Sequence, residues 1–568
     1  MTDIRQKISH QDWLSINKPA RYMGGEVNQV PSKDNPKVRI CIVFPDVYEL
    51  GMSNLAVKIF YEILNKRPEI YAERAFAPFP DFSELLQRKD LPLFSLETGT
   101  PLKDFDALFI TLPYEMTFTN ILHILDVSKI PLQWKERQTG PLIISGGPSS
   151  SNPLPLSLFM DAVFIGEGEE AVIEMADLIA EMKEQNIQGS ERRQALTKIE
   201  GLWVPEFPAP VKHRIYKGFV DSVPPLNPVL PNIQAVHDRA TIEIFRGCTA
   251  GCRFCNAGFY YRPKRERKVE DVLAYSKALL ENTGEDTLGL LSLSTSDYRH
   301  LEKLIKGLDD LKLYPEQSIS IPSLRMSDNT VTLLNASKNI RKGGLTFAPE
   351  AGTQRLRDII NKNVTEEDII QVITSASTST YKKIKLYFMM GLPFETEEDL
   401  EGLVDLVNRL EETVRAMKPR KTISISLSGF VPKAFTPFQW ARQATTEELI
   451  EKRKLVCDGL KRFNTPISWR DEITCLIEAL FARGDEKISE LLLVAYKNGC
   501  FMDGWYEFFS ADNWLKSIEE MNINLNDYLG EKSINAPLPW DFVDYGTPKS
   551  FFLSEYQKAA KIAGVELQ

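Results

Sequence analysis

The sequence lacks long apolar segments and contains only seven cysteines. None of its apolar runs approaches the roughly 20 residues that a membrane-spanning helix needs. Its start, MTDIRQKISHQDW, has no apolar core of a signal peptide. Seven cysteines are an odd set for a disulfide framework. We therefore expect a cytoplasmic protein with no membrane span, whose clustered cysteines serve metal or redox chemistry rather than bridges.

The sequence has no excess of basic residues. The formal net charge is −10, which speaks against nonspecific nucleic-acid binding because such binding depends on Lys and Arg that neutralise phosphates. A local basic groove stays open. Hydrophobic residues at 43% and charged residues at 26% are typical of a soluble globular protein. A chain of 568 residues is too long for one ordinary core, so we expect two to four domains.

Residues 36–200 predict a doubly wound α/β domain, after a polar leader at 1–35. VRICIVF at 38–44 is apolar on both faces, which is typical of a buried parallel strand. The segment 53–66 has apolar residues at helical spacing. Further apolar segments, among them DALFITL, PLIISGG and DAVFIGEG, continue the alternation. Strands interleaved with helices indicate a Rossmann-like domain with helices on both faces of a parallel sheet.

Residues 239–440 predict a second alternating region, a partial barrel. The proline-rich segment 201–238 is expected to be a linker, because proline cannot donate to a strand ladder and stiffens extended chain. Six apolar strands are too few for a closed eightfold barrel, so we expect an open (β/α)6 barrel with its chemistry on the loops after the strands. Residues 441–568 are expected to form a helical and then irregular C-terminal domain. The six strands are 241–245, 287–294, 318–323, 344–350, 383–390 and 422–428.

Three cysteines, Cys248, Cys252 and Cys255, follow the first predicted barrel strand in the spacing CxxxCxxC. A 4Fe–4S cluster normally takes four thiolates, so three leave one iron free for the amino and carboxylate groups of S-adenosylmethionine (SAM). A structural zinc site is the alternative. Zinc normally takes four protein ligands, and no fourth Cys or His lies nearby in the sequence. The motif therefore predicts an iron–sulfur cluster.

With Phe254 directly before the last cysteine, the motif resembles that of the radical SAM superfamily. The resemblance implies that the cluster passes an electron into SAM and that a 5′-deoxyadenosyl radical is released. It also implies a low-potential electron donor such as flavodoxin or ferredoxin. Phe254 would lie against the adenine side of SAM, and a phenylalanine of the core is the alternative.

The same resemblance places SAM contacts at the ends of the later barrel strands. Ser296 and Asp297 stand where the superfamily often has a Gly-Gly-Glu stretch. Arg325 would clamp a carboxylate with two hydrogen bonds, unless it is a solvated surface arginine. Glu350 would bind ribose hydroxyls or position substrate, or else cap a helix. Gly391 would let adenine approach the backbone closely.

The first domain resembles the cobalamin-binding domains that precede the barrel in one large subgroup of the superfamily. Such domains often carry D-x-H-x-x-G after the first strand, and this chain has DVYELG at 46–51. Tyrosine replaces the histidine, so the resemblance implies cobalamin without a histidine axial ligand. Ordinary turn glycines in a domain without a cofactor are the alternative. The candidate cobalamin contacts are Asp46, Tyr48, Gly51, Thr111, Gly146 and Gly147.

The expected activity is a radical SAM reaction on an unknown substrate, with RNA and protein both open. We expect cobalamin-assisted methylation or another modification of a C–H bond. One alternative is a cobalamin-free modifier of RNA or ribosomal protein, and another is a noncatalytic metal-binding scaffold. Methylthiotransferases use three more cysteines in the N-terminal domain, where this chain has only Cys41. The basic run RPKRERK at 262–268 is either a solvated face or a surface for an anionic substrate or redox partner.

Overall fold

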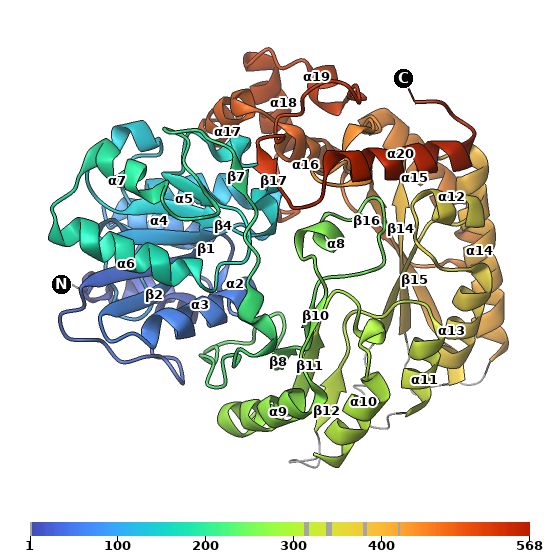
Figure 1. Cartoon of the computed structure of the whole chain (residues 1–568), viewed down its shortest axis with the longest axis horizontal. Coiled ribbons are helices and arrows are strands. Elements are labelled where there is room, and N and C mark those ends of the chain that lie inside the picture. Colours follow the sequence, from blue (N-terminus) through green and yellow to red (C-terminus); the bar gives the residue numbers. More distant parts are fainter. Residues whose placement is uncertain (1–2, 312–316, 337–343, 379–382, 418–420, 568) are drawn as a thin grey trace.

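The computed structural model describes residues 3–311, 317–336, 344–378, 383–417 and 421–567. Figure 1 shows an N-terminal α/β domain in blue to teal, a half-open barrel in green to orange, and C-terminal helices in orange to red that lie across both. The predicted α/β fold class is confirmed. Among the described residues, no helix combines the length and the apolar character that crossing a bilayer requires.

The N-terminal sheet has six strands in the order β2-β1-β3-β4-β5-β6. The first five are parallel, and β6 at the edge is antiparallel. A 2-1-3-4-5 order is that of flavodoxin-like sheets, in which ligands bind beyond the carboxyl ends of the strands. The strands are β1 Val38–Phe44, β2 Ile70–Phe76, β3 Ala107–Thr111, β4 Leu142–Gly146, β5 Ala162–Phe164 and β6 Leu202–Trp203.

Helices cover both faces of this sheet, which is why its first strand is apolar throughout. Ile40 and Ile42 of β1 belong to the core that also holds apolar residues of α3 and α6. Cys41 and Val43 point the other way, into the core formed with α4 and α5. Successive side chains of a strand alternate between faces, so both sets must be apolar. The helices are α3 Leu55–Asn65, α4 Pro80–Arg88, α5 Phe118–Val127 and α6 Ala171–Glu184.

The barrel consists of two groups of parallel strands. One sheet has the order β12-β11-β8, and the other has the order β13-β14-β15-β16. All six predicted strands are present, and β16 adds a seventh parallel strand from the region that was expected to be helical. The strands are β8 Ala240–Glu243, β11 Thr287–Leu291, β12 Ser318–Ser320, β13 Gly344–Glu350, β14 Lys383–Met390, β15 Thr422–Gly429 and β16 Ile467–Trp469.

The C-terminal part joins the two domains. Helix α17 packs on α5 of the first domain, and α20 packs on α12, Gln354–Ile359, of the barrel. The expected linker also takes part in pairing, because β7, Val211–Lys212, lies beside β17, Val543–Asp544. The helices are α15 Thr446–Gly459, α16 Glu472–Arg483, α17 Glu486–Lys497, α18 Ala511–Glu520, α19 Leu525–Leu529 and α20 Lys549–Ala563.

Candidate functional site

The three cysteines lie within a hairpin that follows the first barrel strand. Strand β9, Phe245–Arg246, pairs antiparallel with β10, Arg265–Glu266. Between them lie the cysteines and the short helix α8, Asn256–Tyr260. None of the three thiols is in a disulfide, and each cysteine is half-buried. The backbone N–H of Gly258 donates to Sγ of Cys255, with an N to S distance of 3.3 Å.

A turn after α12 holds the cysteine loop from one side. Asn361 and Asn363 have left-handed backbones, with φ of 53° and 50°, which asparagine adopts more readily than most residues. Nδ2 of Asn361 donates to the carbonyl oxygen of Gly251 at 2.9 Å, and Nδ2 of Asn363 donates to that of Ala250 at 3.4 Å. The position of the loop is therefore set by the turn as well as by its own hairpin.

Between those two asparagines, Lys362 places a cation near the thiols. Its Nζ lies 3.0 Å from Oε1 of Glu350, and both side chains are largely buried. The same Nζ lies 5.9 Å from the ring centroid of Phe254. Burial raises the pKa of Cys252 and of Cys255, the latter to about 12, and Lys362 opposes both increases. Burial alone would lower the pKa of Lys362, but Glu350 and the two thiols raise it overall.

The donor set fits an iron–sulfur cluster. Cys248 raises the pKa of Cys252, and both of them raise the pKa of Cys255, which places the thiols near one another. Each thiolate of a 4Fe–4S cluster binds a different iron, so the sulfur atoms need not converge on one point. A zinc ion requires such convergence. Within the described part of the chain, no three His, Cys, Asp or Glu side chains converge on a single metal ion.

Most of the predicted SAM contacts gather around this loop. Arg325 lies 3.5 Å from Asp297 in an ion pair, and its backbone N–H donates to Oγ of Ser296 at 3.0 Å. Its guanidinium donates to the backbone oxygen of Lys362 at 3.2 Å, which connects the group to the turn beneath the cysteines. The predicted residues brought together here are Phe254, Ser296, Asp297, Arg325 and Glu350.

Gly391 has a structural reason of its own to be glycine. Its φ is +74°, and a Cβ at this position would lie 2.8 Å from Cβ of Ala444. Its N–H donates to Oε1 of Glu395 at 2.9 Å. The turn after β14 therefore needs a left-handed residue against which the chain before α15 can pack. A role for Gly391 beside adenine stays a prediction.

A cavity of about 400 Å³ lies between the carboxyl edge of the N-terminal sheet and the cysteine hairpin. Thr111, Gly146 and Gly147 line it from the sheet, and Gly247 and Tyr261 line it from the hairpin. Its wall is largely apolar where α3 and α6 contribute to it. Both the volume and the position beyond parallel strands are typical of a small-molecule site.

One end of this cavity carries charged residues that were not predicted as site residues from the sequence. Arg246 lies 3.2 Å from Glu167, 2.8 Å from Glu169 and 2.9 Å from Glu243 in ion pairs. Burial raises the pKa of Glu169. For Glu167 burial is outweighed by Arg265 and Arg246, which lower the pKa overall. The signal that could have found them is GEGE at 166–169, acids at the carboxyl end of a buried strand.

The other predicted cobalamin residues, Asp46, Tyr48 and Gly51, do not line this cavity. Nε1 of Trp505 from the C-terminal part donates to Oδ1 of Asp46 at 2.9 Å. The hydroxyl of Tyr48 donates to a buried glutamate of the N-terminal segment at 3.1 Å. A Cβ on Gly51 would lie 2.1 Å from the ring of Phe76. These three residues are engaged in internal contacts, so of the predicted cobalamin residues only Thr111, Gly146 and Gly147 line the cavity.

Most basic side chains of the run at 262–268 are partly or fully buried, whereas Lys268 is exposed. Arg265 forms a two-bond ion pair with Glu167, with distances of 2.8 and 2.5 Å. Nζ of Lys264 donates to the backbone oxygen of Asp297 at 2.6 Å. The run therefore connects the cysteine hairpin to the N-terminal domain and to the loop that follows β11, the second barrel strand. A surface for an anionic substrate or redox partner on this run stays a prediction.

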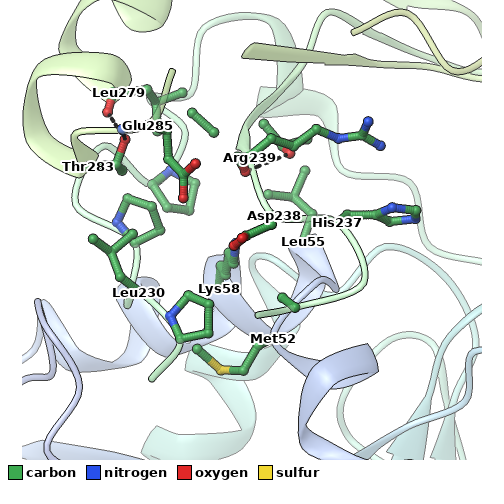
Figure 2. Close-up of a pocket in the computed structure, with 16 residues that line it drawn as sticks. Met52, Leu55, Lys58, Leu230, His237, Asp238, Arg239, Leu279, Thr283 and Glu285 are labelled. Atoms are coloured by element: carbon green, nitrogen blue, oxygen red, sulfur yellow. Dashed lines mark hydrogen bonds between the residues drawn. The ribbon is translucent and has the colours of Figure 1, made fainter. Parts of the chain in front are cut away.

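A second, much smaller cavity of about 20 Å³ lies where α3 meets the proline-rich segment. Figure 2 shows Lys58, Asp238 and Glu285 around it. Burial lowers the pKa of Lys58, and Glu285 and Asp238 oppose this. None of the predicted site residues lines this cavity.

Comparison with known proteins gives two family matches. Residues 56–205 match "Radical SAM proteins, N-terminal", and residues 242–407 match "Radical SAM superfamily". The uncharacterized protein MJ0966 of Methanocaldococcus jannaschii is 28% identical over 80% of this chain and 90% of its own length. The putative methylthiotransferase MJ0865 of the same organism is 24% identical over 65% of this chain and 73% of its own length.

Two solved structures are similar in outline. The radical SAM methyltransferase TsrM from Kitasatospora setae, with cobalamin and a [4Fe-4S] cluster bound, gives a TM-score of 0.49 at 14% identity, over 72% of this chain and 79% of that one. The cobalamin-dependent SAM radical enzyme OxsB gives 0.46 at 13% identity, over 93% and 79%. The two family matches together span more than half of the chain and include the cysteine loop. The chain belongs to the radical SAM superfamily and is an enzyme of that superfamily.

Proposed function

We propose that this enzyme binds a 4Fe–4S cluster through Cys248, Cys252 and Cys255 and cleaves SAM to methionine and a 5′-deoxyadenosyl radical. The observation that carries the proposal is the gathering of three unbonded thiols with a buried cation at the carboxyl ends of the barrel strands. When bound, such a cluster supplies one electron to the sulfonium of SAM. A flavodoxin or ferredoxin would supply that electron to the enzyme.

The residues around the loop would orient SAM. Arg325 is held by Asp297 and by carbonyl oxygens, and a guanidinium has five N–H donors, so it retains donors for the methionyl carboxylate. Phe254 would cover the adenine side. When bound, SAM would supply a 5′-deoxyadenosyl radical that takes a hydrogen atom from a substrate C–H bond, leaving 5′-deoxyadenosine and a substrate radical.

We further propose that the 400 Å³ cavity takes part of a cobalamin. The apolar walls from α3 and α6 suit a flat heteroaromatic base, and the glycines after β4 leave the backbone accessible to its polar tail. The cavity ends at the cysteine hairpin, so a bound corrinoid would lie between the two domains. When bound, cobalamin supplies a methyl group, which makes methylation of the substrate carbon the favoured outcome.

Methylthiolation of RNA or ribosomal protein is a weaker candidate. It is favoured by the relatives of that description, among them a ribosomal protein uS12 methylthiotransferase of Pelotomaculum thermopropionicum, 24% identical over 30% of this chain. Those enzymes use three further cysteines in the N-terminal domain. Cys41 is the only cysteine before the barrel in this sequence, and it is fully buried in β1.

Anaerobic reconstitution of the full chain tests the first proposal. We expect about four irons per chain and formation of 5′-deoxyadenosine from SAM with a low-potential reductant. Bound zinc without cleavage of SAM would favour the noncatalytic scaffold instead.

Titration with hydroxocobalamin, followed by its absorbance, tests the second proposal. Ala56 lies on the cavity wall. We expect Ala56→Trp to weaken hydroxocobalamin binding at least about tenfold, because the indole fills part of the cavity. Lys66 is the C-terminal cap of the same helix. Lys66→Trp is therefore the matched control and should bind hydroxocobalamin like the wild type. Absence of a bound spectrum with the wild type, or equal binding by A56W, would contradict the corrinoid site.

A further inference from the structure

Lys362 and Glu350 form a buried ion pair whose position is not explained by barrel packing alone. Nζ of Lys362 is 3.0 Å from Oε1 of Glu350, and the two side chains are 12% and 14% exposed. Burying two charges costs free energy even when they are paired. Such a pair is therefore expected to serve something beyond stability, and its ammonium lies 5.9 Å from the ring centroid of Phe254 in the cysteine loop.

The backbone is shaped to present this pair. Glu350 has φ of 69° at the end of β13, which is unusual for glutamate. Lys362 stands between two asparagines that are themselves left-handed and that donate to the cysteine loop. The guanidinium of Arg325 donates to the backbone oxygens of both Lys362 and Asn363. The backbone of Lys362 is therefore held beside the cysteine loop by side-chain contacts on both sides.

The ammonium of Lys362 approaches the cysteine loop, because its Nζ lies 5.9 Å from the ring centroid of Phe254. After burial, Lys362 is the largest influence on the pKa of Cys252, and Glu350 comes last among the charges that act on it. Lys362 also acts on Cys255. The position of Nζ beside Phe254, which directly precedes Cys255, therefore places the positive end of the ion pair next to the cysteine loop.

We propose that the Lys362 ammonium, held in place by Glu350, raises the reduction potential of the iron–sulfur cluster bound by the three cysteines. This inference rests on the proposed function, because it requires the cluster. One-electron reduction by a flavodoxin or ferredoxin adds one negative charge to the cluster. A positive field in a poorly solvated site stabilises the reduced form more than the oxidised form. Lys362 is thus a positioning residue for electron transfer, and it acts before SAM is bound.

The test is a redox titration of the anaerobically reconstituted full chain without SAM, followed by the electron paramagnetic resonance signal of the reduced cluster. We expect Lys362→Met to lower the midpoint potential so that the ratio of reduced to oxidised cluster at a fixed ambient potential falls about tenfold, which is about 59 mV for one electron. Lys362→Arg keeps the charge and should titrate close to the wild type. Glu350→Gln removes the opposing charge and should raise the midpoint.

Lys452→Met is the matched control. Lys452 pairs with the buried Glu395 at 2.9 Å, on another strand end of the same half-barrel, and its loss should leave the midpoint unchanged. The double variant K362M/E350Q leaves no unpaired charge and should lie between the two single variants, so it tests the proposal if K362M fails to fold. Equal midpoints for K362M and K452M, or a lowered midpoint for E350Q, would overturn the inference. Failure of the wild type to hold a cluster would instead overturn the proposed function.

Discussion

In each domain a loop with glycines and polar or thiol side chains follows the first strand. The two loops differ in whether those side chains are engaged in internal contacts. In the loop after β1, Asp46 contacts Trp505 and Gly51 packs against Phe76. The loop after β8 and β9 keeps three half-buried thiols that form no disulfide. Sequence motifs at strand ends therefore indicate where chemistry can occur. Whether it does occur depends on what the rest of the chain packs against them.

The largest difference between the loops should appear on substitution of a cysteine. Cys252→Ala removes one of the three expected ligands, so we expect the iron content of anaerobically reconstituted protein to fall from about four per chain to near zero. SAM cleavage should be lost with it. Cys41→Ala, in β1, is the control and should retain the cluster. Retention of the full cluster by C252A would remove the basis of the comparison.

A pH effect should mark the part of the C-terminal chain that covers the β1 loop. Asp503, two residues before Trp505, is buried, and burial raises its pKa to about 6 from 3.8. The folded protein therefore binds a proton that the unfolded chain has released between about pH 4 and 6. The contribution of Asp503 to stability should fall by about 3 kcal/mol as pH rises through this window.

Asp503→Asn isolates that effect. Asparagine can keep both hydrogen-bonding partners, Thr119 and Trp514, without a charge. The difference in free energy of unfolding between wild type and D503N, measured by denaturant titration from pH 4 to 7, should shift in favour of the variant as pH rises. A difference that is independent of pH would contradict the raised pKa.

A smaller effect should distinguish the glycines of the two loops. Gly51→Ala places a methyl group 2.1 Å from the ring of Phe76, and overpacking of this kind typically costs about 2 kcal/mol. Gly258→Ala, in α8, meets only the Cys255 side chain at ordinary contact distances of 3.5 Å and more. Thermal unfolding should therefore detect G51A but not G258A. Equal stability of the two variants would mean that the β1 loop is not tightly packed.

Most of the strands could be predicted, and the exceptions have a physical explanation. β1 and the six barrel strands are apolar on at least one face, which a sequence displays directly. β2 was missed because Glu73 and Arg74 stand in its middle. Both are buried and paired, Glu73 with Arg39 and Arg74 with Glu97. Those partners lie in other segments, so the local sequence pattern does not indicate a buried strand.

By itself the sequence determined the α/β class and the cysteine loop, because periodic apolar residues and the spacing of three thiols are local properties. Only the tertiary structure decided that Lys362 lies beside Phe254 of the cysteine loop, that Glu167 and Glu169 border a cavity, and that Trp505 contacts the β1 loop. Each of these contacts joins residues far apart in the chain, and side-chain charge and burial act through space. The physical chemistry of the site therefore depends on distances that no stretch of sequence contains.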